Sequence, residues 1–163
     1  MSWENSSAIT PLKRDFLKTF LSLEKRFFLT GGSALGLFYL QHRFSYDLDL
    51  FSTENFEWID KVQVDTLHEI MLNKITTLIS RCELKDIVDL YFLEKKGMRV
   101  ETYFEEAQQK DGGLDPSMIS LLLGSVAIVE LPDYMIKPLT VEDLRAFVDD
   151  LKRRMALLAY PSE

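Results

Sequence analysis

Apolar residues spaced three and four positions apart predict helices along most of the chain. Their stripe is continuous in residues 66–82. Helices are also predicted in five other segments: 11–26, 84–97, 99–110, the segment opened by Asp115-Pro116, and the segment after Thr140. Asp and Thr are common helix N-caps, which supports the starts at Asp115 and Thr140. Helices therefore dominate the chain from residue 66 onward.

The strand pattern is confined to the first third of the chain. "RFFLTGG" predicts a buried strand that ends at glycine, and "SALGLFYLQHR" after it has helical length. "YDLDLFS" alternates polar and apolar residues, which predicts a strand with Asp47 and Asp49 on one face. Residues 56–65 fit either a helix start or a strand. We expect an α+β fold, in which a helical section of residues 66–163 packs against residues 1–65 as one compact unit.

Composition narrows the class of protein. The chain has 163 residues, 47% apolar and 28% charged, which is ordinary for a globular protein with a core. The net charge of −7 argues against a broad phosphate-binding surface, although a local basic pocket would be compatible with it. A single cysteine excludes an internal disulfide. Because the sequence shows neither a signal peptide nor an apolar run of about 18 residues, we expect a cytoplasmic protein without membrane contact.

Asp47 and Asp49 are the first candidates for chemistry, because Asp is unfavourable inside a strand. The strand period places both carboxylates on one face, roughly 6–7 Å apart at the backbone. On a buried sheet the two charges would repel and lose hydration, so a divalent cation is expected beside them, and Mg²⁺ fits best. The alternative is an edge strand whose outer face is solvated.

A glycine turn precedes these aspartates, between the first predicted strand and its helix. A helix N-terminus offers free N–H groups to a phosphate. Gly31 and Gly32 would let that phosphate approach the backbone, and the Ser33 hydroxyl would add a donor. The alternative is a tight turn with glycine at positive φ. Together, the turn and Asp47 and Asp49 are the minimum set for metal-assisted phosphoryl transfer.

Gly-Gly-Ser, a helix and then Asp-x-Asp on a strand resemble the signature of the nucleotidyltransferase superfamily, which has the polymerase-β-like fold. More narrowly, "FLTGGSALGLFYLQHRFSYDLDLF" is similar to the AbiEii/AbiGii toxin family. "HEIMLNKITTLISR", "LKDIVDLYFL" and "YMIKPLTVEDLRAFVDDL" are also similar, so the resemblance covers residues 12–52 and 65–158. It implies a small mixed sheet of the nucleotidyltransferase type, shortened to residues 1–65. It also implies an NTP substrate, an RNA or protein acceptor, one or two Mg²⁺ ions and an antitoxin partner.

The resemblance further implies that Lys74 and Arg81 bind the nucleotide phosphates. Lys74 lies on the apolar stripe of residues 66–82, where a lysine needs a partner or must snorkel to solvent. Asp86 and Asp89 are one helical turn apart. They could be ion-pair partners of Lys74 and Arg81, or they could act as catalytic acid–base groups.

One carboxylate of the superfamily pattern has no clear counterpart. The superfamily places a third carboxylate on a strand several tens of residues after Asp-x-Asp, whereas the next candidate, Asp65, follows Asp49 much more closely. Asp65 would substitute if residues 47–52 and 62–65 paired as adjacent strands. It could equally cap the helix of residues 66–82.

The sequence therefore supports hypotheses from different classes. The first is a Mg²⁺-dependent nucleotidyltransferase that moves a nucleotide from an NTP to an RNA or protein hydroxyl, as the toxin of a toxin–antitoxin pair. The second is a catalytically inactive, shortened relative that acts as a nucleotide- or partner-binding module. The third is a structural partner-binding protein whose aspartates are simply solvated.

Overall fold

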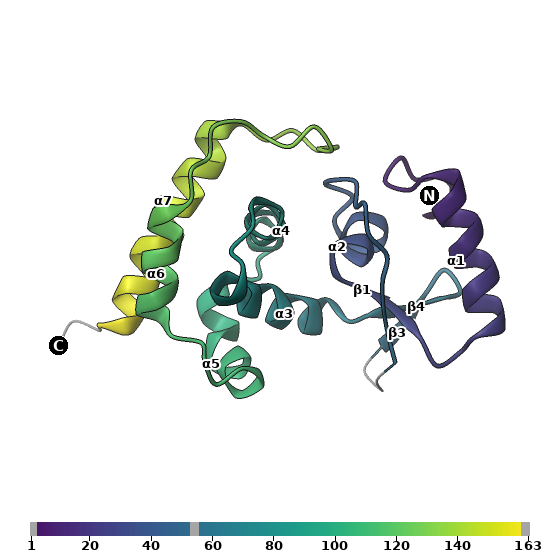
Figure 1. Ribbon diagram of the computed structural model, residues 1–163, viewed down its shortest axis with the longest axis horizontal. Helices are drawn as coiled ribbons and strands as arrows, with labels where there is room; N and C mark the ends of the chain where they lie inside the picture. Colours follow the sequence, from purple (N-terminus) through teal and green to yellow (C-terminus); the bar gives the residue numbers. More distant parts are fainter. Residues whose placement is uncertain (1–2, 53–55, 161–163) are drawn as a thin grey trace. The chain divides into compact units, whose positions relative to one another are not determined.

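The computed structural model describes residues 3–52 and 56–160. The chain forms two compact units (Figure 1). Unit 1 comprises Met1–Ile70 together with Tyr134–Pro138, and unit 2 comprises Met71–Asp133 and Leu139–Glu163. The two units are therefore not consecutive halves of the sequence, because a short late segment returns to the N-terminal unit.

Unit 1 is built on a mixed four-stranded sheet with the strand order β2-β1-β4-β3. The strands are β1 (Phe28–Thr30), β2 (Asp49–Phe51), β3 (Phe56–Ile59) and β4 (Val62–Asp65). Strand β1 pairs antiparallel with β2 and parallel with β4, and β3 pairs antiparallel with β4. Every residue of β1 and β4 is buried, as expected for the two central strands. The sheet confirms the predicted α+β class.

Residues 56–65, which the pattern left ambiguous, form a β-hairpin. Its turn is made by Asp60 and Lys61, whose φ angles are 47° and 66°. Two consecutive positive φ angles are typical of the type I′ turn, whose twist matches that of the paired strands. The sequence shows no Asn-Gly or Asp-Gly here, so the strongest local hairpin signal was missing.

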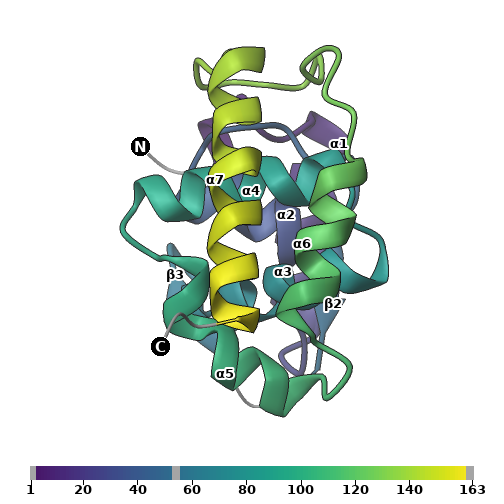
Figure 2. The same ribbon diagram turned by 90° about the vertical axis from the view of Figure 1, so that its left-hand side faces the viewer.

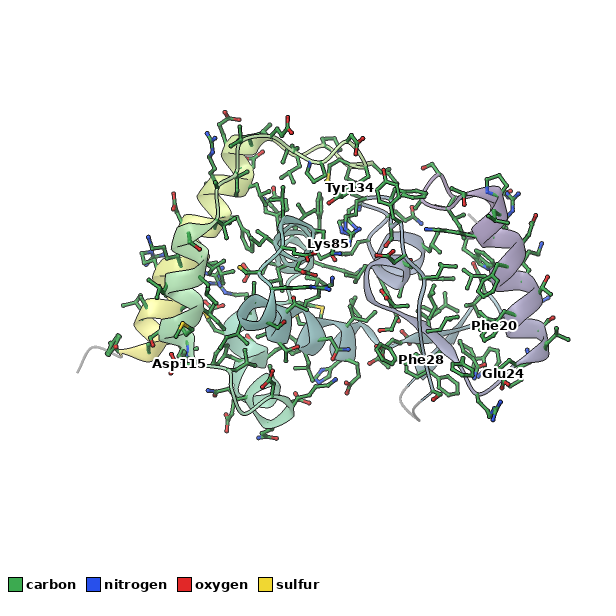
Figure 3. The ribbon with its side chains drawn as sticks, in the orientation of Figure 1. Phe20, Glu24, Phe28, Lys85, Asp115 and Tyr134 are labelled. Carbon is green, nitrogen blue, oxygen red and sulfur yellow. The ribbon has the colours of Figure 1, made fainter. Side chains whose placement is uncertain are left out.

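The helices of unit 1 are η1 (Trp3–Asn5), α1 (Pro11–Leu23), the short α2 (Gly31–Ala34) and a π-helical turn, η2 (Leu35–Tyr39). In Figure 1 the sheet strands run between α1 and α2. The helix predicted after the glycine turn is thus present, but it ends at Tyr39. Phe28 of β1, labelled in Figure 3, stacks on Phe56 of β3 with ring centroids 5.8 Å apart. The sheet therefore has an aromatic face.

Unit 2 is helical. Its elements are the C-terminal part of α3 (Leu67–Ser80), α4 (Leu84–Lys95), α5 (Val100–Lys110), α6 (Pro116–Ser125) and α7 (Val141–Ala159). Helices α6 and α7 lie side by side in Figures 1 and 2. The predicted caps are present: Asp115, labelled in Figure 3, accepts from the N–H of Met118, and Thr140 accepts from that of Asp143.

An arginine on α7 ties three helices of unit 2 together. The Arg154 guanidinium donates to both carboxylate oxygens of Glu94 on α4, at 2.9 Å each, and to Glu101 on α5. Its Nε donates to Asp150, one turn earlier on α7, at 2.7 Å. Bidentate arginine–carboxylate pairs are geometrically specific, so this cluster helps to fix how α4, α5 and α7 pack.

Residues Tyr134–Pro138 join unit 1 through backbone hydrogen bonds. The N–H of Phe44 donates to the Tyr134 carbonyl at 2.8 Å, and the N–H of Ile136 donates to the His42 carbonyl at 2.8 Å. Arg43 and Met135 form an isolated antiparallel bridge between these contacts. The segment thus braces the residues that immediately precede Asp47.

Within the described residues, we find no helix that is both long and apolar enough to traverse a lipid bilayer.

Candidate functional site

Three polar side chains line up across one end of the sheet in unit 1. Thr30, the last residue of β1, is the register partner of Asp49 on β2. On its other side, the Thr30 hydroxyl donates to the Asp65 carboxylate of β4 at 2.5 Å. Directly paired residues share a face of a sheet, so Asp49, Thr30 and Asp65 all lie on one face. Two carboxylates from opposite sides of β1 therefore flank the residue that leads into the glycine turn.

Gly31 is required at this turn for two physical reasons. Its φ is +62°, in the left-handed region that other residues adopt only at a cost. A Cβ at Gly31 would also lie 2.5 Å from Oδ2 of Asp49, so the exposed Asp49 side chain would have to move to admit it. The positive-φ turn named as an alternative is therefore present at Gly31. The turn also brings an exposed carboxylate directly against the glycine backbone.

The structure corrects the predicted environment of the two aspartates. Strand β2 begins only at Asp49, so Asp47 precedes the strand and the strand period does not apply to it. Both side chains are exposed and β2 is an edge strand, so of the two alternatives the structure shows the solvated edge strand and not the buried sheet. The Ser33 hydroxyl donates to the Asp47 carbonyl, which ties the glycine turn to the residues before β2.

Two cations beside this turn were not singled out from the sequence. The Arg43 side chain is buried, and a Cβ at Gly32 would lie 2.5 Å from its Nη2. Lys13 of α1 donates from Nζ to the carbonyls of Ser45, at 2.9 Å, and Tyr46. Burial lowers the pKa of Lys13, and the nearby Asp47 carboxylate partly offsets this effect. A basic residue between the glycines and Asp-x-Asp could have drawn attention to Arg43, whereas Lys13 carries no local signal.

Asp65 differs from both sequence-based expectations. Strands β2 and β4 are not adjacent, because β1 lies between them. Asp65 is also not the cap of α3, since the Thr66 hydroxyl accepts from the N–H of Glu69 at 3.2 Å. It is instead the last residue of β4, only 4% exposed, and its carboxylate accepts from Thr30. Asp65 therefore lies on the opposite side of β1 from Asp49, with Thr30 between the two carboxylates.

The donor set of unit 1 is chemically suited to Mg²⁺. Asp47 and Asp49 offer exposed carboxylates, and Mg²⁺ is commonly held by one or two carboxylates together with water and substrate phosphate oxygens. Among the residues that the structure describes, no group of three or more His, Cys, Asp or Glu side chains is close enough to hold a metal ion. The protein part of a metal site here would thus be the two aspartates alone.

The remaining predicted residues form an ion-pair cluster in unit 2. Lys74 Nζ lies 2.7 Å from Oδ1 of Asp86 and 2.7 Å from Oδ2 of Asp89. Arg81 donates from Nε and Nη2 to the two oxygens of Asp86, at 2.9 and 3.1 Å. Asp86 and Asp89 are fully buried, Lys74 is 5% exposed, and the Arg81 side chain remains 44% exposed. Lys74 therefore does not snorkel to solvent.

Charge balance explains how these groups tolerate burial. Burial alone would lower the pKa of Lys74, but the carboxylates of Asp89 and Asp86 outweigh it and hold the pKa above the ordinary value. The ion pairs allowed for Asp86 and Asp89 in the sequence are present. Phosphate binding by Lys74 and Arg81, and acid–base catalysis by Asp86 and Asp89, stay predictions. A phosphate at Lys74 would have to compete with two carboxylates.

Unit 1 thus has a small mixed sheet with a glycine turn after its central strand β1 and carboxylates on both neighbouring strands, β2 and β4. This arrangement is compatible with a nucleotidyltransferase-like unit. Residues 15–61 match the family model described as nucleotidyl transferase AbiEii toxin of type IV toxin–antitoxin systems. This match confirms the resemblance to the AbiEii family. No curated protein and no solved structure matches the chain.

The matched residues lie in unit 1 and cover its glycine turn, Asp47 and Asp49. The match ends at residue 61, before Asp65 and before the ion-pair cluster of unit 2. The matched range thus includes the residues of the glycine turn and the Asp-x-Asp pair. It does not extend to Lys74, Arg81, Asp86 or Asp89.

Proposed function

We propose that the protein is a Mg²⁺-dependent nucleotidyltransferase, with its reacting groups at the sheet end of unit 1. The observation that carries the proposal is the row Asp49–Thr30–Asp65, which places carboxylates on both sides of the strand leading into the glycine turn. The family match over residues 15–61 supports the same assignment.

In this proposal the backbone at Gly32 and Ser33 binds the phosphates of an NTP, and the guanidinium of Arg43 beside Gly32 contributes positive charge. Asp47 and Asp49 would hold Mg²⁺, which supplies neutralisation of charge on the phosphates. An acceptor hydroxyl attacks the α-phosphorus, loses its proton, and forms a phosphodiester or phosphoester bond while pyrophosphate leaves. Asp65, if released from Thr30, is the carboxylate best placed to accept that proton.

Lys74 and Arg81 would stabilise charge on the triphosphate, as the family resemblance implies. This part of the proposal rests on the resemblance alone, because Lys74 is already neutralised by Asp86 and Asp89. The partly exposed Arg81 is the better placed of the two to reach a phosphate from solvent. The acceptor is an RNA or a protein, and the family name makes an antitoxin partner part of the proposal.

The direct test incubates the protein with each NTP labelled at the α-phosphate, Mg²⁺, and total RNA or total protein as acceptor. We expect label to enter one acceptor class only when Mg²⁺ is present. Asp49→Asn should lower the rate of label transfer at least about 100-fold. Mutating a residue that only supports a metal ligand typically costs about 10–100-fold in activity, and loss of the ligand itself should cost more. Asp149→Asn, an exposed aspartate of α7, is the matched control and should leave the rate unchanged. Absence of product with every NTP, or product unaffected by Asp49→Asn, would contradict the proposal.

A second candidate, an inactive nucleotide-binding module, is favoured by one specific observation. The Asp65 carboxylate is buried and already accepts the Thr30 hydroxyl, so it is engaged in the fold. A protein that binds Mg²⁺–NTP but yields no labelled product would be this module. Loss of that binding in Asp49→Asn would show that the same site is involved.

A further inference from the structure

Three aromatic rings gather next to Asp47 in unit 1. The ring centroid of Tyr46 lies 5.2 Å from that of Phe44 and 5.8 Å from that of Tyr134, and both pairs are edge to face. Tyr134, labelled in Figure 3, comes from the returning segment Tyr134–Pro138. Tyr46 is 64% exposed although two rings hold it, so much of its surface faces solvent beside the proposed metal ligand.

The backbone under Tyr46 is fixed from two directions. Lys13 Nζ donates to the carbonyls of Ser45 and Tyr46, and the N–H of Phe44 donates to the Tyr134 carbonyl at 2.8 Å. A ring held in this way loses little conformational entropy when a ligand covers it, which is the advantage of preorganisation. Single exposed apolar residues are common on protein surfaces and by themselves indicate no function. Tyr46 differs from them because its backbone and its ring are both held by neighbouring residues.

Positive charge accompanies the rings. Lys13 Nζ lies 5.2 Å from the ring centroid of Phe44, and Arg43 Cζ lies 5.7 Å from that of Tyr134. Of the three rings only Tyr46 is exposed; Arg43 is buried and Lys13 already donates to two carbonyls, so the two cations contribute positive charge beside Tyr46 rather than direct phosphate contacts. Surfaces that bind unpaired nucleotides stack bases on exposed aromatic rings, and positive charge nearby favours the phosphates. A purely apolar ligand would gain nothing from the two cations. An apolar peptide would also meet the carboxylates of Asp47 and Asp49.

We propose that Tyr46, supported by Phe44 and Tyr134, is a stacking surface for a nucleobase. The proposal rests on the proposed function only for the source of the base, which is either the NTP or an RNA acceptor. Stacking itself requires no transfer. The platform is also separate from the glycine turn, because it would bind the base rather than the phosphates.

The test compares Tyr46→Leu, which removes the aromatic face, with Tyr46→Phe, which keeps it. Tyr160→Leu, at a tyrosine that is 74% exposed in unit 2, is the matched control. Dissociation constants are measured for AMP and UMP, for ribose 5-phosphate, which has no base, and for a short single-stranded RNA. All variants are first checked for an unchanged unfolding transition.

We expect Tyr46→Leu to weaken binding of a base-containing ligand roughly ten-fold, while Tyr46→Phe and Tyr160→Leu bind like the original protein. Ribose 5-phosphate should bind all variants equally. An effect on the mononucleotides assigns the base to the NTP, and an effect on the RNA alone assigns it to the acceptor. Equal affinities of Tyr46→Leu and the original protein for every base-containing ligand, or no binding by the original protein, would overturn the platform.

The transfer assay separates this inference from the proposed function. If labelled product is never formed but Tyr46→Leu still weakens nucleotide or RNA binding, the transferase proposal fails and the platform stands. If transfer proceeds and Tyr46→Leu leaves the KM for NTP and for RNA unchanged, the platform fails and the transferase proposal stands.

Discussion

Asp49 in unit 1 and Asp86 in unit 2 belong to segments that look equally like functional motifs in the sequence, yet the structure places them in opposite environments. Asp49 is exposed, and its carboxylate lies against a glycine backbone. Asp86 is fully buried, and both its oxygens are held by Lys74 and Arg81. The exposed Asp49 carboxylate is accessible to a ligand, whereas the negative charge of Asp86 is neutralised by Lys74 and Arg81 inside the fold. Burial and partners, rather than residue type, distinguish the two.

The largest expected effect comes from breaking the buried cluster. Lys74→Met would leave the carboxylates of Asp86 and Asp89 buried without their shared ammonium group, which should cost about 3–5 kcal/mol of unfolding free energy. Urea unfolding measures this cost. Lys85→Met is the control, because Lys85 pairs at 3.0 Å with Glu83 and both side chains are partly exposed, so its cost should stay within about 1 kcal/mol. An equal loss of unfolding free energy in the two variants would show that the buried ion pairs stabilise the protein no more than an exposed ion pair does.

The next effect tests the row across the sheet of unit 1. Thr30→Val keeps the shape of the side chain but removes the donor to the buried Asp65 carboxylate, at a cost of about 1–3 kcal/mol. Thr102→Val, at an exposed position of α5, controls for the substitution itself. If Thr30→Val proves as stable as the original protein, then Asp65 does not depend on Thr30 and the row loses its central link.

A smaller effect is expected at the glycine turn. Gly31→Ala would force a residue with a side chain to adopt φ near +62° and would press its Cβ against the Asp49 carboxylate, which can move because it is exposed. We expect the unfolding free energy to fall by about 1–2 kcal/mol, mainly because alanine is strained in the left-handed backbone conformation. Gly112→Ala, where a Cβ would meet nothing within 4 Å, should change the unfolding free energy little. A neutral Gly31→Ala would contradict the geometry of the turn.

The smallest expected effect concerns the stability of the protein in acid. Burial would raise the pKa of Glu101, but hydrogen bonds from Arg154 outweigh it and bring the pKa below the ordinary 4.5. A lowered pKa in the folded state means that the contribution to stability is present above pH 4.5 and is lost as the pH falls through the folded value. Glu101→Gln should therefore show a shallower loss of stability as the pH falls below 4.5. If Glu101→Gln and the original protein lose stability identically with falling pH, Glu101 does not stabilise the fold through its contact with Arg154.

Local patterns were enough to predict most of the helices and the first strand. Asp115 and Thr140 each accept a backbone N–H at the start of a helix, so these two helix-start signals were correctly interpreted. The hairpin of residues 56–65 was left undecided between a helix start and a strand, because its turn, Asp60-Lys61, reaches positive φ without a glycine. The pairing partners of the strands could not be predicted either, because strand order depends on contacts between distant segments. The position of β1 between β2 and β4 is one example.

The candidate site was predictable in its residues but not in its grouping. Asp47, Asp49 and the glycine turn were found from spacing, and the structure links them through Ser33 and Gly31. The burial of Arg43 and the reach of Lys13 could not be foreseen, because both depend on how α1 and residues 42–46 pack. Likewise, no local signal shows that Tyr134 returns to unit 1.

We propose that the exposed carboxylates of unit 1, and not the buried ones of unit 2, receive a metal–nucleotide ligand. Calorimetric titration of Mg²⁺–NTP into the original protein, Asp49→Asn and Asp149→Asn tests it most directly. We predict Mg²⁺-dependent binding that Asp149→Asn retains and that Asp49→Asn loses, with the unfolding free energy of Asp49→Asn unchanged within about 0.5 kcal/mol. Binding of equal affinity in all three proteins would contradict the account.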